Sequence, residues 1–246
     1  TGSLSEKPAA FPAGFCLRSF YGATAPKIAP MAPRTPSSKG PKAKTATSHA
    51  RAPQQVRIIG GQYKRTPLPV IDADGLRPTS DRVRETVFNW LGHDLTGWRC
   101  ADIFAGTGAL GFEAASRGAA HVTLVENHAQ AVRALHAIRD KLGARMVDIV
   151  SGDAFAWLAR QPDAALDAVF IDPPFAQDWT LRALEAAARV VKPGGVIYVE
   201  AAQQLADVSA DSHGGEPAAG IGLPADLVLH KHLRAGAVHA HLLLRK

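Results

Sequence analysis

The strongest constraint on the fold is a regular alternation of short apolar runs and longer helical segments. The intervening segments repeat Ala, Leu and Arg at the period of a helix. Strands that alternate with helices and are apolar on both faces form a parallel sheet covered by helices on both sides. The sequence therefore predicts an α/β domain. The five β-rich runs are 101–104, 121–126, 146–153, 166–172 and 195–200.

A small appendage is predicted in front of this domain. Residues 56–70 contain two short β-rich runs around the glycines at 60–61, which indicates a hairpin. A helix is predicted next, because Ser80 is a good N-cap and Asp81 favours the first helical turn. At the far end of the chain, the runs 227–233 and 237–245 are predicted to pair as an antiparallel hairpin.

The charge of the chain is concentrated at its N-terminal end. The formal charge is +6, from 28 Lys and Arg against 22 Asp and Glu. Residues 1–55 hold eight basic residues and one acidic residue, so the rest of the chain is close to neutral. Eight of the 17 prolines also lie there, and no apolar periodicity is present, which predicts a disordered basic tail. Such a tail acts either as a solvated linker or as an electrostatic contact to nucleic-acid phosphates. The predicted organisation is a tail at 1–55, an appendage at 56–95 and a main domain at 96–246.

The composition excludes several other classes of protein. No apolar run approaches the 18 residues that a membrane-spanning helix requires. Cys16 and Cys100 are too few for a disulfide framework, and no Cys or His residues have the spacing of a zinc motif. We therefore expect a soluble, cytoplasmic protein that needs neither a membrane nor a metal. Four histidines alternate along the final hairpin, where no metal site is expected: His230, His232, His239 and His241.

A glycine-rich turn connects the first strand of the main domain to its first helix. It spans residues 102–111, and Gly106 and Gly108 let the backbone turn sharply and approach a ligand. Glu126 ends the second strand, where its carboxylate can accept hydrogen bonds from two ribose hydroxyls. The pattern predicts a nucleotide-like cofactor across the strand ends. It does not distinguish NAD from S-adenosylmethionine, and a purely structural turn is the alternative.

A third acidic residue, Asp153, ends the third predicted strand. In a doubly wound sheet this position lies beside the adenine of a bound nucleotide, and the carboxylate could accept a hydrogen bond from the adenine amino group. Acidic residues at strand ends also commonly cap the following helix. Both interpretations are open from the sequence.

The segment Asp172-Pro173-Pro174-Phe175 follows the fourth predicted strand directly. Its two prolines fix φ and remove backbone donors, so the loop is stiff. The Asp172 carboxylate and a proline carbonyl can together accept both protons of an amino group. An aromatic amine is a weak nucleophile, so holding it in line with an electrophilic methyl group promotes reaction through orientation and electrostatics. A rigid turn without chemistry is the alternative.

This motif resembles the Asp/Asn-Pro-Pro-Tyr/Phe motif of amino-group methyltransferases that use S-adenosylmethionine. More specifically, residues 56–245 are similar to the bacterial RsmD family, and residues 77–85 carry the most family-specific part of the resemblance. Members of that family methylate the N2 amine of one guanine in small-subunit ribosomal RNA. The resemblance implies the same reaction here, without a metal or a covalent enzyme intermediate.

The resemblance also implies a fold and a site. The fold is a Rossmann-like class I methyltransferase with a seven-strand sheet in the order 3-2-1-4-5-7-6 and a small N-terminal appendage. The implied catalytic residues are Asp172 and Pro173 at the target amine, Pro174, and Phe175 stacked on the flipped base. The residues implied around S-adenosylmethionine are Thr79, Asp102, Phe104, Ala105, Gly106, Thr107, Gly108, Glu126, Asn127, Asp153 and Ala154.

The appendage is predicted to face RNA and to close the cofactor pocket. Its basic residues are partly balanced by acidic ones, and Arg82 and Glu85 could simply pair along the helix. The predicted RNA contacts are Arg57, Tyr63, Lys64, Arg65, Arg77, Arg82 and Arg84.

Other functions are compatible with part of this pattern. An adenine-N6 or cytosine-N4 methyltransferase acting on DNA or another RNA would use the same amine-holding motif. An NAD-dependent oxidoreductase would share the glycine-rich turn and Glu126 but would not need Pro173 and Pro174. A non-catalytic RNA-binding assembly factor could keep the fold without the chemistry. The expected partner is small-subunit ribosomal RNA within an assembling ribosomal particle, bound by a monomer.

Overall fold

A computed structural model describes residues 56–70, 80–174, 179–206 and 221–246. The predicted tail at 1–55, with Thr79, Arg77 and Phe175, lies outside the described residues. Among the described residues, no helix is long and apolar enough to cross a membrane.

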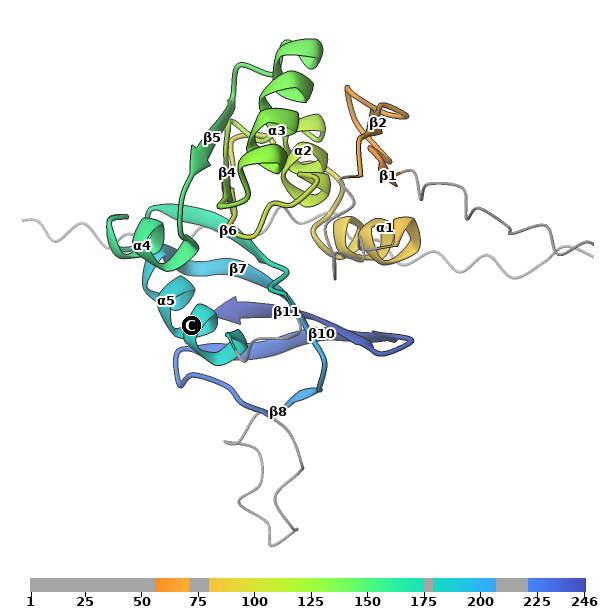
Figure 1. The fold of residues 1–246 in the computed structure, drawn as a ribbon. Coiled ribbons are helices and arrows are strands. Elements are labelled where there is room, and N and C mark those ends of the chain that lie inside the picture. The colour runs from red at the N-terminus through yellow and green to blue at the C-terminus, as the bar shows by residue number, and fades with distance from the viewer. Residues whose placement is uncertain (1–55, 71–79, 175–178, 207–220) are drawn as a thin grey trace, which may run out of the picture. The chain divides into compact units, whose positions relative to one another are not determined.

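Within the described part of the chain, seven strands form one sheet in the order β10-β11-β7-β6-β3-β4-β5 (Figure 1). The five strands from β3 to β7 are parallel to their neighbours, and the β10–β11 hairpin adds to β7 in the antiparallel direction. Numbered within the sheet, this is the order 3-2-1-4-5-7-6, so the predicted topology is confirmed. The strands are β3 Arg99–Asp102, β4 His121–Glu126, β5 Val147–Ser151, β6 Leu166–Ile171, β7 Val191–Ala201, β10 Leu227–Ala235 and β11 Val238–Arg245.

Helices cover both faces of the sheet because side chains alternate along each strand. Phe170 and Tyr198 point into one core, which helices α1, α2 and α3 cover. Ile171 and Val199 point into the other core, which helices α4 and α5 cover. The helices are α1 Asp81–Trp90, α2 Ala109–Ser116, α3 Ala129–Leu142, α4 Ala154–Ala159 and α5 Thr180–Val190.

The N-terminal appendage has the predicted hairpin and helix. Strands β1 Val56–Arg57 and β2 Pro67–Leu68 pair antiparallel. The Ser80 side chain accepts a hydrogen bond from the Val83 amide at 3.4 Å and caps α1, as its residue type predicts.

The structure also contains strand pairing that the sequence did not predict. Strands β8 Leu205–Ala206 and β9 Ile221–Gly222 form a short parallel pair. Strand β7 starts at Val191, four residues before the predicted start at 195, although Pro193 and two glycines interrupt its β-rich pattern.

Candidate functional site

The glycine-rich turn lies at the carboxyl ends of β3 and β4, which are adjacent in the sheet. Gly106 and Gly108 have φ values of 52° and 75°, which favour glycine. A Cβ atom on Gly108 would lie 2.7 Å from the Phe112 ring, so the turn could not pack on α2 with a larger residue. The Glu126 carboxylate accepts hydrogen bonds from the Gly106 amide at 2.8 Å and the His128 amide at 2.7 Å. The predicted turn and the predicted acidic residue are therefore in direct contact.

Asp102 lies beneath this turn and is 2% exposed. Its Oδ2 accepts a hydrogen bond from the Gly111 amide at 3.0 Å, whereas Oδ1 has no hydrogen-bond partner within the described residues. Burial, assisted by the negative charge of Glu126, raises the pKa of Asp102 to about 7 against the opposing hydrogen bonds of the Gly111 and Phe104 amides. A buried acceptor that the protein leaves unsatisfied is costly, so it marks a place where a ligand donor fits.

The turn also carries an aromatic cluster that the sequence alone did not reveal. The Phe104 ring stacks on Trp179 with centroids 5.8 Å apart and meets Phe155 edge-on at 6.2 Å. The guanidinium of Arg182 lies 3.9 Å from the centroid of Phe155. Phe104 was predicted at the cofactor from its position in the turn, but the side chains around it come from separate helices and could not be assigned to it from sequence.

Asp153 is exposed and its Oδ1 accepts a hydrogen bond from the Ala156 amide at 2.7 Å, which caps α4. The capping interpretation is therefore confirmed, while a contact with adenine stays a prediction that the second carboxylate oxygen could serve. Of the neighbouring predicted residues, Asn127 is exposed and Ala154 is buried. Ala105 is also buried and donates its amide hydrogen to the Val125 carbonyl at 3.0 Å, while Thr107 is half-buried.

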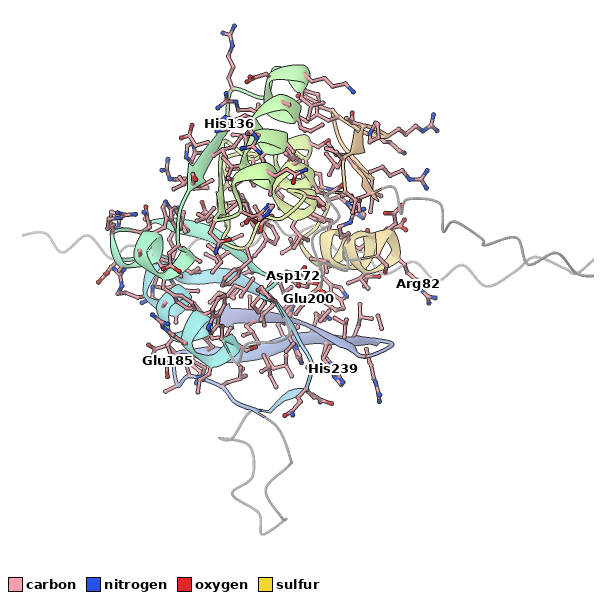
Figure 2. All side chains as sticks on the ribbon, viewed as in Figure 1. Arg82, His136, Asp172, Glu185, Glu200 and His239 are labelled. Carbon is pink, nitrogen blue, oxygen red and sulfur yellow. The ribbon has the colours of Figure 1, made fainter. Side chains whose placement is uncertain are left out.

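The Asp172-Pro173-Pro174 segment begins directly after β6, as predicted. Asp172 is half-buried, Pro173 is buried and Pro174 is exposed. Strand β7 lies beside β6, with Phe170 opposite Tyr198. Figure 2 shows Asp172, which directly follows β6, near Glu200 on β7, and both carboxylates act on Tyr198.

Tyr198 and Glu200 form a buried pair that the sequence analysis missed. The Tyr198 hydroxyl donates a hydrogen bond to Glu200 Oε1 at 2.8 Å. Burial raises the pKa of Tyr198 well above its usual value, and the negative charges of Glu200 and Asp172 add to this effect. An acidic residue at the end of an apolar strand was the available signal. Two carboxylates, those of Glu200 and Asp172, thus act on the buried Tyr198 hydroxyl.

Three of the predicted RNA-binding residues border an open groove on the appendage. Arg57, Lys64 and Arg65 line it, together with the acidic residues Asp81 and Glu85. Arg57 Nε lies 3.1 Å from Asp81 Oδ2. Arg82 is exposed on α1 (Figure 2). These four basic side chains are accessible to a ligand.

Two other predicted RNA contacts are contradicted by burial. Arg84 is fully buried, and its guanidinium donates to the Arg57 carbonyl at 2.9 Å and to Asp81 Oδ1 at 2.6 Å. It lies four residues before Phe88 on the packed face of α1, and burial lowers its pKa. Tyr63 is 7% exposed, and its hydroxyl faces Met146 rather than solvent. Neither side chain is presented to RNA.

The appendage is fixed to α2 by Glu113, which is fully buried. Its carboxylate accepts hydrogen bonds from the amides of Ile59 at 2.6 Å and Gly60 at 2.8 Å, and from Arg117 Nε at 2.8 Å. The Arg117 guanidinium also lies 4.9 Å from the centroid of the Phe88 ring. The groove is therefore attached to the same helix whose N-terminus follows the glycine-rich turn.

Comparison with known proteins places this site in context. The model of the family described as Conserved hypothetical protein 95 matches residues 56–212. Ribosomal RNA small subunit methyltransferase D of Escherichia coli K12 is 40% identical over 192 residues, which cover 78% of this chain and 91% of that protein. The protein of the same name in Haemophilus influenzae is 38% identical over 151 residues, covering 59% of this chain and 78% of the relative.

Solved structures agree with these sequence matches. The Escherichia coli protein yhhF, a candidate methyltransferase, has a TM-score of 0.63 at 36% identity, covering 78% of this chain and 98% of that chain. A candidate methylase of Haemophilus influenzae has a TM-score of 0.59 at 30% identity, with the same coverage. The family-model match, at residues 56–212, includes the appendage as well as most of the main domain.

Proposed function

The chain belongs to the RsmD-type family described as Conserved hypothetical protein 95, and from this membership we propose that it is a ribosomal RNA methyltransferase. Its substrate is the N2 amine of a guanine in small-subunit ribosomal RNA, and its cofactor is S-adenosylmethionine. The observation that carries the proposal is the Asp172-Pro173-Pro174 loop at the edge of the sheet where the glycine-rich turn also lies, in a chain 40% identical to a named methyltransferase D. The enzyme is proposed to act as a cytoplasmic monomer on an assembling ribosomal particle.

The residues at the ends of β3 and β4 fit S-adenosylmethionine. Gly106 has no Cβ, and an atom added there would have nothing within 4 Å, so a ligand can approach the backbone. Glu126 has carboxylate lone pairs for ribose hydroxyls besides those that hold the turn. The unsatisfied Asp102 Oδ1 offers a buried acceptor for a donor of the ligand or a bridging water. When bound, the cofactor supplies a methyl group on a positively charged sulfur.

Asp172 and Pro173 are proposed to hold the target amine. The carboxylate and the proline carbonyl accept its two hydrogens, which turns the nitrogen lone pair toward the methyl carbon. On accepting a methyl group the amine nitrogen would gain positive charge, which the nearby carboxylates of Asp172 and Glu200 would stabilise. The surplus proton then leaves the amine, with Asp172 as its proposed acceptor.

The open groove of the appendage is proposed to contact the RNA backbone. Arg57, Lys64, Arg65 and Arg82 are exposed, and Lys and Arg side chains bind phosphates independently of sequence. Asp81 and Glu85 in the same groove disfavour a continuous line of phosphates, so we expect contacts at its basic side only.

The Asp172→Ala variant tests the catalytic part of the proposal. We expect the methylation rate to fall by at least about 100-fold, because an electrostatic and orienting group is lost, while S-adenosylmethionine affinity changes little. Asp140→Ala, an exposed change on α3, serves as the control and should leave both quantities unchanged. Unchanged turnover in Asp172→Ala would remove the proposed role of Asp172.

The reaction products separate the remaining functions. Mass spectrometry of nucleosides, after incubation with small-subunit particles or with naked ribosomal RNA, should show N2-methylguanine and identify the preferred substrate. Methylated adenine or cytosine would indicate a different target amine. Calorimetric titration should show binding of S-adenosylmethionine and not of NAD, and an NAD complex would instead favour an oxidoreductase.

A further inference from the structure

Three histidines meet on the β10–β11 hairpin, outside the proposed methyltransferase site. His232 lies directly opposite His241 in the antiparallel register, and His239 precedes His241 by two residues. Residues opposite each other and residues two apart project from the same face, so all three side chains share it. Each histidine contributes one ring nitrogen to a group of three nitrogens that lie within 4.8 Å of one another. The sequence spacing concealed this group, because only the hairpin register brings His232 to the other two.

Two of these rings already bring ring nitrogens into direct contact. His232 Nε2 lies 3.0 Å from His239 Nδ1, the ring centroids are 5.2 Å apart, and the planes differ by 12°. These values mean that the ring edges meet nearly in one plane, with a single proton between the two nitrogens. With bonds of about 2.0–2.1 Å at a tetrahedral angle the two nitrogens would lie roughly 3.3–3.4 Å apart. Both rings would also have to turn, so that their lone pairs point at the ion and no longer at each other.

His241 supplies a second, independent observation. It is fully buried, and its Nε2 accepts a hydrogen bond from the Leu205 amide at 3.1 Å. Its Nδ1 has no hydrogen-bond partner within the described residues. Because the Leu205 amide donates to Nε2, the proton of the neutral ring lies on Nδ1. Coordination through Nδ1 would move this proton to Nε2 and break the hydrogen bond with the Leu205 amide, since two N–H groups cannot bond to each other. The lost hydrogen bond is part of the cost of binding the metal.

Each neutral imidazole of the group has one ring nitrogen with a lone pair that can bind a metal. Arg234 lies opposite His239 on the same face of the hairpin, and its Nε donates a hydrogen bond to the Gly236 carbonyl at 3.1 Å. Neutral imidazoles are preferred ligands of zinc, copper and nickel ions.

We propose that His232, His239 and His241 bind one divalent transition-metal ion, with zinc as the representative ion. Solvent provides the remaining coordination position, because His232 and His239 are half-exposed. The ion would cross-link β10 to β11. His239 is visible on this hairpin in Figure 2, on the side of the sheet remote from α2 and α3.

The proposed ion has a structural rather than a catalytic role. Ala240 lies opposite Glu200 in the sheet and faces the core that contains Tyr198. His239 and His241, on either side of Ala240, therefore face the opposite side from the Tyr198–Glu200 pair. Zinc binding should raise the melting temperature of the hairpin region and leave methyl transfer unchanged.

Titration of the metal-free full chain with Co²⁺ tests this proposal, because bound Co²⁺ absorbs visible light. We expect one equivalent to bind, to give visible bands and to be displaced by Zn²⁺. In His239→Gln, affinity should fall by more than the roughly 10–100-fold that loss of an outer-sphere partner causes. His232→Gln is a second variant, in case the first alters the fold.

His230→Gln is the matched control, since His230 is exposed on the same hairpin but is not in the group. It should bind Co²⁺ as the unchanged chain does. The proposal would be overturned if the unchanged chain did not bind one equivalent of Co²⁺. It would also be overturned if His239→Gln and His232→Gln bound Co²⁺ as tightly as the unchanged chain. Equal weakening by His230→Gln would overturn it too, because binding would then not depend on this particular triad.

Discussion

Two buried carboxylates, Glu113 on helix α2 and Asp102 at the end of strand β3, differ in how many hydrogen bonds they accept from the protein. Glu113 accepts hydrogen bonds from two backbone amides and from Arg117. Asp102 accepts one hydrogen bond of regular geometry, from the Gly111 amide, and a weaker contact from the Phe104 amide, and its Oδ1 has no partner of regular geometry within the described residues. Burial alone therefore does not mark a functional carboxylate. Asp102, which has an oxygen without a regular partner, belongs to the proposed cofactor site, whereas Glu113 holds the appendage in place.

The difference follows from what each region must do. The appendage has two-residue strands and little core of its own, so its position depends on a few strong contacts to α2. The carboxyl edge of the sheet is held by the whole sheet and can leave an acceptor open for a ligand. Functional sites are where such local costs are expected in an otherwise consistent fold.

The largest expected effect is on the satisfied carboxylate. Glu113→Gln keeps the shape of the side chain but leaves Arg117 buried without its counter-charge. Breaking a buried ion pair in this way costs about 3–5 kcal/mol, which should appear in urea denaturation. Glu185→Gln, on the exposed face of α5 (Figure 2), is the control and should stay within about 0.5 kcal/mol. A loss below about 1 kcal/mol in Glu113→Gln would show that the anchor is unimportant.

The unsatisfied carboxylate should instead produce a pH effect. Asp102 binds a proton up to a pKa of about 7 in the folded chain, against about 3.9 when unfolded. The folded state is therefore favoured at acid pH, and this advantage is lost as pH rises through 7. The linkage amounts to about 4 kcal/mol at most, of which about 2 kcal/mol falls between pH 5.5 and pH 8.

Asp102→Asn should remove this pH dependence, because its amide does not titrate. The difference in unfolding free energy between the variant and the unchanged chain should shift in favour of the variant by about 2 kcal/mol from pH 5.5 to pH 8. Thermal denaturation without cofactor at both pH values measures it. A constant difference would mean that Asp102 is already ionised at pH 5.5.

The sequence was sufficient for the sheet and for the backbone of the site. Apolar strand runs and turn residues report local requirements, and from these the parallel sheet, the final hairpin and the Ser80 cap followed. The strand order came from the family resemblance and agreed with the hairpin predicted from the residues.

Side-chain partners across the fold were not accessible in this way. Arg84 is basic and lies in a basic segment, so the sequence predicted it at the surface, but the phase of α1 places it on the packed face. Glu113, Tyr198 and the histidine group acquire their partners only through tertiary packing and strand register. A charged residue is not necessarily exposed, because a segment that is distant in the sequence can cover it in the fold.

The third carboxylate, Glu126, sharpens the comparison from the side of the ligand. Glu126→Gln keeps the shape but removes the charge that we propose for binding ribose hydroxyls. Hydrogen bonds to charged groups contribute about 1.5–3 kcal/mol, so S-adenosylmethionine affinity should fall about 10–100-fold in calorimetry. Stability should fall much less than in Glu113→Gln, since Glu126 is half-buried. A stability loss as large as that of Glu113→Gln would make Glu126 an anchor as well.

The smallest effect is expected on the groove that Glu113 holds in place. Lys64→Gln removes one exposed positive charge from the groove, so RNA affinity should weaken similarly for different sequences. The steepness of log affinity against log salt concentration should decrease by about one, because the variant makes one phosphate contact fewer and its binding therefore releases fewer counterions. Filter-binding assays across a salt series measure this slope. Lys141→Gln, an exposed change on α3, is the control and should leave it unchanged. An equal change in both variants would show that net charge, and not the anchored groove, determines RNA binding.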